Sequence, residues 1–505
     1  MKKFYGAVLI VTIFNVSERL LGFFYRIMLS RSIGAEGIGV YQIAVSVFAV
    51  LITATSSGVP VTVSRLIAKK RAQNDFNAEY KIVTAGILLC LFLSAPLFLI
   101  IIFFRNNLGF LFSDERCLPI FTLLAPILIF NCFYSVIRGF FWGRKQYFPY
   151  SIAEFAEEVS MIVTGLVLIN LSVGSAGGAV AAGIALMFSN LVSFVFAVIL
   201  FFAKGGMIKN PKGCFKEIAA PAFSITALRT AGTAVNMLIA VLLPMRLIFY
   251  GYTQSEAIAL FGASFGMAFP LLFLPSALIG SLALVLVPEL SETMQSGKSE
   301  QLAQKVQSSI KFTSILSCGV IPFYIIFGKD LGLILYQNEF SGVFLTYAAV
   351  LILPMCLSQI STSMLNSLGK EKHTLIGYFA SSVLLITAIL FLPKYMGVYS
   401  LLAGMLLCCT ATVVSDFIFL NKTCKIKPAY LFNVLLSAAL VIPVTMMGVY
   451  TYNILNFIMP WFFASALTVI VTLAFNIGFY LLLNVISPGR FKELFNFHKK
   501  VTSNK

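Results

Sequence analysis

The feature that most constrains this chain is a series of apolar runs, each about 20 residues long, that recur from one end to the other. As an α-helix, a run of that length crosses the hydrocarbon core of a bilayer, whereas membrane β-strands give shorter alternating segments. Hydrophobic residues make up 59% of the chain and charged residues only 11%, against about 25% charged residues in soluble proteins. The sequence therefore predicts an all-α integral membrane protein.

We expect about fourteen membrane-spanning helices, joined by short connections. The predicted spans are 4–29, 37–63, 80–104, 117–138, 150–171, 177–203, 218–246, 256–288, 308–328, 343–366, 373–393, 397–420, 429–452 and 460–486. If the N-terminus is cytoplasmic, 27 of the 36 Lys and Arg residues lie on the inner side and six on the outer side. Basic residues gather on the cytoplasmic side of membrane proteins. This asymmetry predicts a multi-pass protein of the cytoplasmic membrane with both termini inside.

The net charge of +17 also bears on the partners of the chain. Basic residues in short inner loops suit anionic phospholipid, so we expect membrane lipids and no nucleic acid as partners. The nine cysteines include no CxxC motif, and most lie within apolar segments. They predict buried thiols, with no disulfide framework, no metal site and no cofactor. We expect the protein to be a monomer.

An internal repeat divides the chain. "GIGVYQIA" followed by "GVPVTVSRLIAKK" corresponds to "AIALFGAS" followed by "LVLVPELSETM", and "IRGFFWGRKQYF" corresponds to "MLNSLGKEKHTL". The repeat predicts an N-lobe of six spans over 1–205, a C-lobe of six spans over 206–425, two further spans over 426–488 and a basic cytoplasmic tail over 489–505. Because both copies begin on the same side of the membrane, we expect a substrate path between the lobes.

The first span carries an unusual polar stripe. Asn15, Arg19, Gly22 and Arg26 fall on one face of the expected helix, and Glu18 lies beside Arg19. An ionisable side chain at the bilayer centre costs about 2.5–3.5 kcal/mol, so each needs a partner, water or a function. We interpret Arg19, with Asn15 and Glu18, as lining a polar cavity. Arg26 lies close to the outer surface, where it either lines the cavity or extends to the headgroups.

Arg229 lies near the middle of the span 218–246, with Asn236 further along the same helix. Two interpretations stay open: the pair lines a cavity between the lobes, or Arg229 is bound by backbone carbonyls or by a carboxylate of another span. Arg65 and Lys69, at the inner end of the second span, are either the floor of that cavity or inner-side anchors.

The fifth span begins with three glutamates, Glu154, Glu157 and Glu158. Negative charge in the first turn suits a helix N-terminus, which explains Glu154. Glu157 lies deeper, and we consider it a partner for a cavity arginine or a site of proton uptake. Asp416, near the inner end of the span 397–420, is expected to lie at the membrane interface.

Arginines in a cavity indicate the kind of substrate. A guanidinium group binds phosphate through two hydrogen bonds and stays charged, which predicts an anionic, phosphorylated substrate. The sequence has no P-loop, so an ion gradient or the membrane potential would drive transport. A multidrug or cation antiporter is the first alternative. A membrane glycosyltransferase or polymerase is the second, but the loops are too short for a catalytic domain, so we do not expect an enzyme.

Three segments carry a resemblance to a known family: "SERLLGFFYRIMLSRSIGAEGIGVYQIA", "GVPVTVSRLIAKK" and "RGFFWGRKQYFPYSIAEFAEE". They resemble the stage V sporulation protein B group of polysaccharide exporters, within the multidrug/oligosaccharidyl-lipid/polysaccharide (MOP) superfamily. That superfamily also includes lipid II flippases of peptidoglycan synthesis and multidrug antiporters. The resemblance implies fourteen helices in two lobes, a cationic cavity, alternating access and outward flipping of polyprenyl-diphosphate-linked glycans.

The resemblance also implies roles for particular residues. The family's cavity arginines correspond to Arg19, Arg26, Arg65 and Arg229, and its fifth-span glutamate corresponds to Glu157. A sodium site of some lipid II flippases uses carboxylates in spans seven and eleven, and neither of those spans is acidic here. The last two spans, expected to be wholly apolar, fit the lipid-tail groove of those flippases. The resemblance does not identify the glycan, nor whether wall growth, sporulation or capsule export uses it.

Overall fold

The computed structural model of this chain describes residues 2–172, 174–296, 299–424 and 429–483. In this part of the chain every regular element is a helix, which confirms the all-α membrane fold. Among the described residues, eleven helices are long and apolar enough to cross a membrane, or twelve if one bent pair counts as a span. Two features account for the difference from the expected fourteen. The first and second spans form one kinked helix, and the fifth span carries three glutamates. The number of spans stays a prediction.

The helices form two compact units. Unit 1 holds α1 (Lys2–Ser56), α2 (Val59–Ala72), α3 (Phe76–Phe103), the 3₁₀-helix Arg105–Leu111, α4 (Cys117–Leu124), α5 (Ile127–Gly143), α6 (Tyr147–Leu171), α7 (Gly174–Ala203), α8 (Phe215–Phe249) and α9 (Gln254–Phe261). The segments Leu335–Asn338 and Ile389–Ser400, the latter with α16 (Pro393–Met396), also belong to it. Backbone carbonyls of these segments accept hydrogen bonds from Arg31 and Arg246, whose side chains hold them in unit 1.

Unit 2 contains the remaining helices. They are α10 (Phe269–Leu272), α11 (Leu274–Gln295), α12 (Ser299–Tyr336), α13 (Glu339–Ala348), α14 (Ile352–Ser367), α15 (Glu371–Phe391), α17 (Ser400–Cys424), α18 (Ala429–Ile458) and α19 (Trp461–Leu482), of which α12, α15 and α17 each contribute an end to unit 1. The π-helical segment Gly262–Ala268 joins α9 to α10, and the boundary between the units falls after Met267. The first helix of the second repeat, α8, thus groups with the first repeat. The division into lobes at residue 205 stays a prediction.

The helix α1 consists of two helices that meet at Gly34. Gly34 has φ 68° and ψ −177°, a conformation that only glycine adopts without strain. A second break follows at Ser57 and Gly58, between the end of α1 and the start of α2. Pro60 favours this break, because proline near a helix start costs no hydrogen bond but cannot continue a helix from the residues before it.

Unit 1 contains a buried ion-pair network between α2, α3 and α5. The carboxylate of Glu79 is fully buried and pairs with Arg144 at 2.8 Å and with Arg71 at 3.5 Å. The Arg144 guanidinium also lies 4.0 Å from the ring centroid of Phe140 and donates to the Tyr80 hydroxyl. A buried carboxylate is tolerated because these two guanidinium groups neutralise it.

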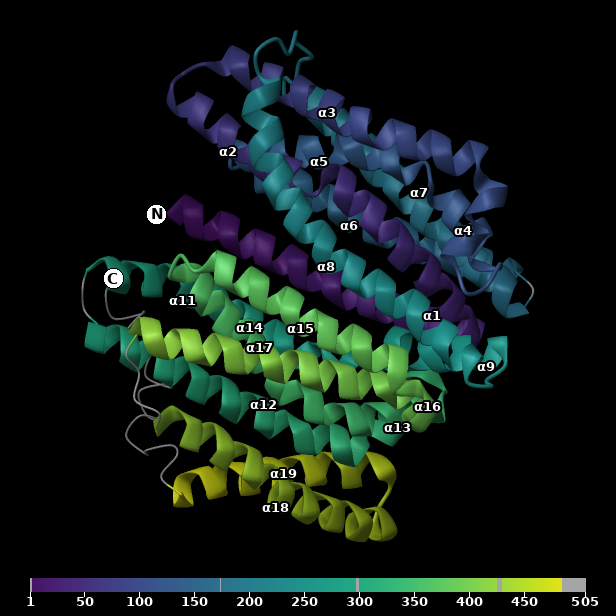
Figure 1. The fold of residues 1–505 in the computed structure, drawn as a ribbon, viewed down its shortest axis with the longest axis vertical. Coiled ribbons are helices and arrows are strands. Elements are labelled where there is room, and N and C mark those ends of the chain that lie inside the picture. Colours follow the sequence, from purple (N-terminus) through teal and green to yellow (C-terminus); the bar gives the residue numbers. More distant parts are fainter. Residues whose placement is uncertain (1, 173, 297–298, 425–428, 484–505) are drawn as a thin grey trace. The chain divides into compact units, whose positions relative to one another are not determined.

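In unit 2, α18 and α19 lie side by side (Figure 1). Every fourth residue of α19 is buried, and three of these residues are polar: Thr468, Thr472 and Asn476. The expectation of a wholly apolar last span is therefore wrong, because hydropathy averages over a helix and misses one polar face. Small residues such as Gly448, packed against Thr472, let the two helices approach.

The longest uninterrupted helix is α12, with 38 residues. Its first turns are fixed to α11 by Lys305, whose ammonium lies 2.7 Å from a carboxylate oxygen of Glu289 and donates to Thr293. At its other end, Asp330 accepts hydrogen bonds from Tyr452 of α18 and Trp461 of α19.

Candidate functional site

All four predicted cavity arginines lie in unit 1. Arg19 and Arg26 belong to α1, Arg65 to α2 and Arg229 to α8. Arg19, Arg65 and Arg229 have exposed side chains, whereas Arg26 is partly buried. Asn236, also on α8, is exposed. Asn15 lies in α1, but its side chain is outside the part that the structure describes.

Arg229 binds the break between α1 and α2. Its Nη1 donates to the carbonyl oxygen of Ser57, 3.0 Å away, one residue beyond the end of α1. The last carbonyls of a helix lack partners within it and carry partial negative charge, so a guanidinium is stabilised there. The structure therefore shows the backbone-carbonyl contact of the second interpretation, with the Arg229 side chain exposed. The lining of a cavity between the lobes stays a prediction.

The same break packs tightly against α8. The amide of Gly58 donates to the Thr226 hydroxyl at 3.1 Å, and Asn131 of α5 donates to the Ser56 hydroxyl at 2.7 Å. A Cβ atom on Gly58 would lie 2.2 Å from the carbonyl oxygen of Ala222. Only glycine allows this approach of two backbones.

We therefore expect Gly58→Ala to separate α8 from the break or to unfold it. Overpacking of this kind costs about 1–3 kcal/mol or more, because the obstructing atom is backbone and cannot rotate away. The measurement is the melting temperature of the purified protein in detergent. Gly478→Ala in α19 is the control, since no atom lies within 4 Å of the added methyl group. Equal melting temperatures for the two variants would contradict this packing.

Arg26 makes a different contact. Its Nη1 lies 3.4 Å from the carbonyl oxygen of Gly266, in the π-helical segment that follows α9. The structure shows the Arg26 guanidinium bound to a backbone carbonyl of the protein. Both interpretations of Arg26, cavity lining and extension to the headgroups, therefore stay predictions. Among the described residues, no hydrogen bond or ion pair engages Arg19.

An acidic cluster lies where α1 meets α6. Glu18 of α1 interacts electrostatically with Glu154, Glu157 and Glu158 of α6. Oε1 of Glu158 lies 3.1 Å from the position of a Cβ atom on Gly22. The glycine of the polar stripe thus makes room for a carboxylate. The sequence predicted the helix face of Glu18 and the depth of Glu157 but not that four carboxylates gather here.

The sequence analysis did not select Arg138 as a site residue, although it is the last residue of the predicted fourth span, 117–138. It lies in α5, partly buried, with Nη1 3.7 Å from Oε1 of Glu154. Its guanidinium also stacks on the rings of Trp142 and Tyr150, at 5.0 and 5.8 Å from their centroids. The spacing of four residues from Arg138 to Trp142, and from Tyr150 to Glu154, was the available signal.

One further predicted position is Asp416. Asp416 is 1% exposed and accepts hydrogen bonds from the hydroxyls of Ser361 and Thr362. The expectation that Asp416 lies at the membrane interface stays a prediction. The structure adds that Ser361 and Thr362 of α14 give this carboxylate a buried polar environment, which a hydropathy profile does not reveal. Within the described residues, no group of three or more His, Cys, Asp or Glu side chains could hold a metal ion.

Unit 2 has an apolar groove of about 430 Å³ between α12, α14 and α18. Its lining includes Ile321, Ile325, Leu353, Val441 and Ile442. The groove contains almost no polar surface, so a hydrocarbon chain is the kind of ligand that it can accept.

A family model described as "Polysaccharide biosynthesis protein" matches residues 6–294. The chain is 27% identical over 364 residues to stage V sporulation protein B of Bacillus subtilis (strain 168), covering 68% of this chain and 69% of that protein. It is 21% identical over 454 residues to the lipid II flippase MurJ of the same organism, covering 82% and 81%.

Solved structures share the fold. The lipid II flippase MurJ in an inward closed conformation matches with a TM-score of 0.70 at 15% identity, covering 94% of this chain and 99% of that chain. An inward-facing multidrug resistance transporter of the MATE family, from the MOP superfamily, matches with a TM-score of 0.66 at 16% identity, covering 84% and 95%. These structures show the architecture of the chain. They do not identify its substrate, because proteins of one fold can have different functions.

Proposed function

Because this chain belongs to the polysaccharide biosynthesis protein family, within the MOP superfamily of flippases and transporters, we propose that it flips a lipid-linked oligosaccharide across the cytoplasmic membrane. The substrate we propose is a polyprenyl-diphosphate-linked glycan, moved outward by alternating access between two lobes. The protein would act as a transporter and not as an enzyme, with membrane lipids around it and no nucleic acid partner.

The observation that carries this proposal is the exposure of Arg229 near the middle of α8. A charged group at that depth is too costly to face lipid, so it needs a polar cavity. Arg19 and Arg65, also exposed, belong to the same unit. Guanidinium groups on α1, α2 and α8 are suited to a diphosphate, and the apolar groove of unit 2 has the composition that a polyprenyl chain needs.

One observation favours a second candidate, a cation antiporter. Glu18 and the three glutamates of α6 lie near one another, and Glu154 accepts a hydrogen bond from Tyr150, whose ring lies against that of Trp142. Carboxylates and aromatic rings bind organic cations. However, Arg138 already occupies the faces of both rings and pairs with Glu154, which leaves less room for a ligand cation there.

A reconstitution experiment separates the two candidates. Wild-type protein in liposomes is expected to move a fluorescent polyprenyl-diphosphate glycan between leaflets, measured by quenching with a membrane-impermeant reagent. Protein-free liposomes and a polyprenyl monophosphate without sugar are the controls. Movement of a cationic dye, with no movement of any diphosphate lipid, would overturn the proposal and favour the antiporter.

A further inference from the structure

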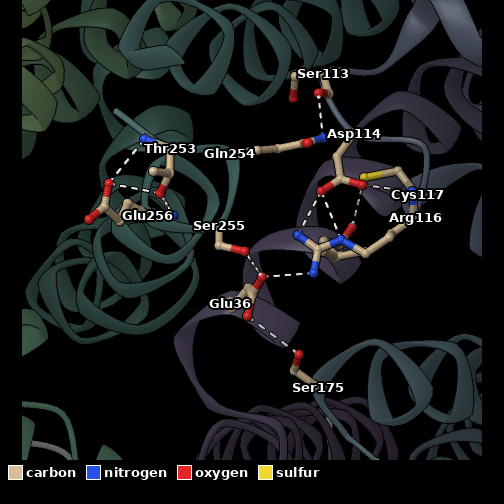
Figure 2. Close-up of polar contacts among 11 residues, drawn as sticks. Glu36, Ser113, Asp114, Arg116, Cys117, Ser175, Thr253, Gln254, Ser255 and Glu256 are labelled. Carbon is tan, nitrogen blue, oxygen red and sulfur yellow. Dashed lines mark hydrogen bonds and ion pairs between the residues drawn. The ribbon is translucent and has the colours of Figure 1, made fainter. Parts of the chain in front are cut away.

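A polar network just after the Gly34 kink of α1 is centred on Glu36 (Figure 2). One carboxylate oxygen of Glu36 accepts hydrogen bonds from Nη1 of Arg116, at 2.7 Å, and from the hydroxyl of Ser255, at 2.6 Å. The other oxygen lies 3.5 Å from the hydroxyl of Ser175. Glu36 therefore joins the kink of α1 to the starts of α4, α7 and α9, which are far apart in sequence.

Most of this network belongs to the first repeat and is held by several hydrogen bonds. Asp114 is 3% exposed and accepts hydrogen bonds from both the backbone amide of Arg116, at 2.7 Å, and its Nε, at 2.9 Å. The hydrogen bonds to Asp114 and Glu36 raise the pKa of Arg116 above its usual range, so its guanidinium stays charged and holds the Glu36 carboxylate in place. The acceptor for Ser255 is thus preorganised.

The helix α9 belongs to the second repeat and reaches this network through its first two residues. Ser255 donates to Glu36, and the side-chain amide of Gln254 donates to the carbonyl oxygen of Ser113 at 3.2 Å (Figure 2). A capping box between Thr253 and Glu256 fixes this end of α9. Both hydrogen bonds connect one short helix to elements of the first repeat.

Beyond these hydrogen bonds, α1 and α9 touch backbone to backbone. A Cβ atom on Gly39 would lie 2.3 Å from the carbonyl oxygen of Ile258, and one on Gly262 would lie 1.9 Å from the carbonyl oxygen of Ala35. No gap remains for a lipid or a sugar between the two helices at this level. The contact therefore closes one end of unit 1.

The helical geometry changes directly after α9. Gly262–Ala268 is π-helical, a rare geometry that frequently marks functional sites and kinks. The boundary between the two compact units falls within it, after Met267. The only side chain outside the segment for which the structure gives a hydrogen bond to it, within the described residues, is Arg26, which donates to Gly266. Residues before and after this boundary thus belong to different compact units.

We propose that α9 is a latched arm, held closed on α1 by Glu36 and Ser113 and hinged at the π-helical segment Gly262–Ala268. Opening this end of unit 1 requires the two hydrogen bonds of Ser255 and Gln254 to break, while Asp114 and Arg116 stay with the first repeat. The inference rests on the alternating access proposed above, because only a transporter with two states needs such a latch. Its test involves no transport, so it can fail independently of the proposed substrate.

The test measures the accessibility of the contact between α1 and α9. Ile258 is fully buried against Gly39, so Ile258→Cys places a thiol in the closed contact. Cells are treated from outside with a membrane-impermeant maleimide, and labelling is compared with the parent that keeps Ile258. Adding Ser255→Ala and Gln254→Ala should raise the labelling rate about fivefold or more, since a hydrogen bond to a charged group alone shifts an equilibrium by about tenfold.

Two variants make the result specific. Ser32→Ala removes a hydroxyl that donates only to the carbonyl of Met28 in its own helix, and it should leave labelling unchanged. Ser255→Thr keeps the hydroxyl and should keep labelling low. Three results would overturn the latch. The first is an equal labelling rate for the double variant and for Ser32→Ala when both proteins are monodisperse, and the second is a higher labelling rate in both. The third is full labelling of Ile258→Cys while Ser255 and Gln254 are still present.

Discussion

Glu79→Ala is expected to lower the stability of the protein by about 3–5 kcal/mol, because it leaves Arg144 as an unpaired charge in a buried site. The Arg144 side chain is 9% exposed, and its remaining polar partner is the neutral hydroxyl of Tyr80. Arg71, which is 43% exposed, can turn toward solvent and contributes little to the loss. The measurement is the fraction of monodisperse protein after heating in detergent, followed by gel filtration.

An exposed ion pair provides the control for this prediction. Glu339 and Lys329 are separated by 2.8 Å, but both side chains are more than half exposed. Pairs of this kind contribute little to stability, so Glu339→Ala should lose monodisperse protein at the same temperature as the wild type. Comparable losses for Glu79→Ala and Glu339→Ala would mean that burial does not determine the strength of the Glu79 network. Glu79→Gln should be intermediate, since an amide keeps one acceptor for Arg144 but no charge.

The second large effect concerns transport. The double variant Arg19→Ala and Arg229→Ala is expected to flip the proposed diphosphate lipid at least about a hundredfold more slowly than wild type. Each charge-assisted hydrogen bond to a phosphate is worth about 1.5–3 kcal/mol, which corresponds to about tenfold or more in rate. The measurement is the initial rate of leaflet exchange in liposomes, at equal amounts of reconstituted protein.

Arg229 also holds the carbonyl of Ser57, so its loss could act through the fold instead of the substrate. Two variants distinguish these effects. Arg229→Lys keeps a charged donor and should retain part of the transport but weaken the recognition of a diphosphate, which favours two parallel hydrogen bonds. Arg105→Ala removes an exposed arginine of the 3₁₀-helix and should leave transport unchanged. Wild-type transport in the double variant would remove both arginines from the proposed site.

The architecture was predictable because it depends on averages over many residues. Apolar runs of about 20 residues specify membrane helices whatever their neighbours are. The glycines that let these helices touch are visible in the sequence, but their roles are not. Gly58 became significant only when Ala222, 164 positions later in the chain, was found against it. Close contacts of this kind arise from long-range packing, which a hydropathy pattern does not contain.

The candidate site was predictable to a lesser extent, for a related reason. Expected depth in the membrane drew attention to charged positions such as Arg229, but it could not say which partners meet them. Arg138 was not selected because it stands at the end of a predicted span, where the limits are uncertain by a few residues, although it stacks on Trp142. The hydroxyl partners of Asp416, Ser361 and Thr362, belong to another span, so the sequence did not predict this contact. Partners on different helices decide what a charge does.

The length of α12 has a practical consequence for imaging the protein. Its 38 residues extend roughly 57 Å at the usual helical rise, whereas the hydrocarbon core of a bilayer is about 30 Å thick. The polar end of the helix therefore projects beyond the lipid as a stiff rod, anchored to α11 through Lys305 and Glu289. A small soluble protein joined to that end through an unbroken helix would be held in a fixed orientation relative to α12. It would provide the marker outside the micelle that particle alignment in electron cryomicroscopy requires for a membrane protein of 55.3 kDa.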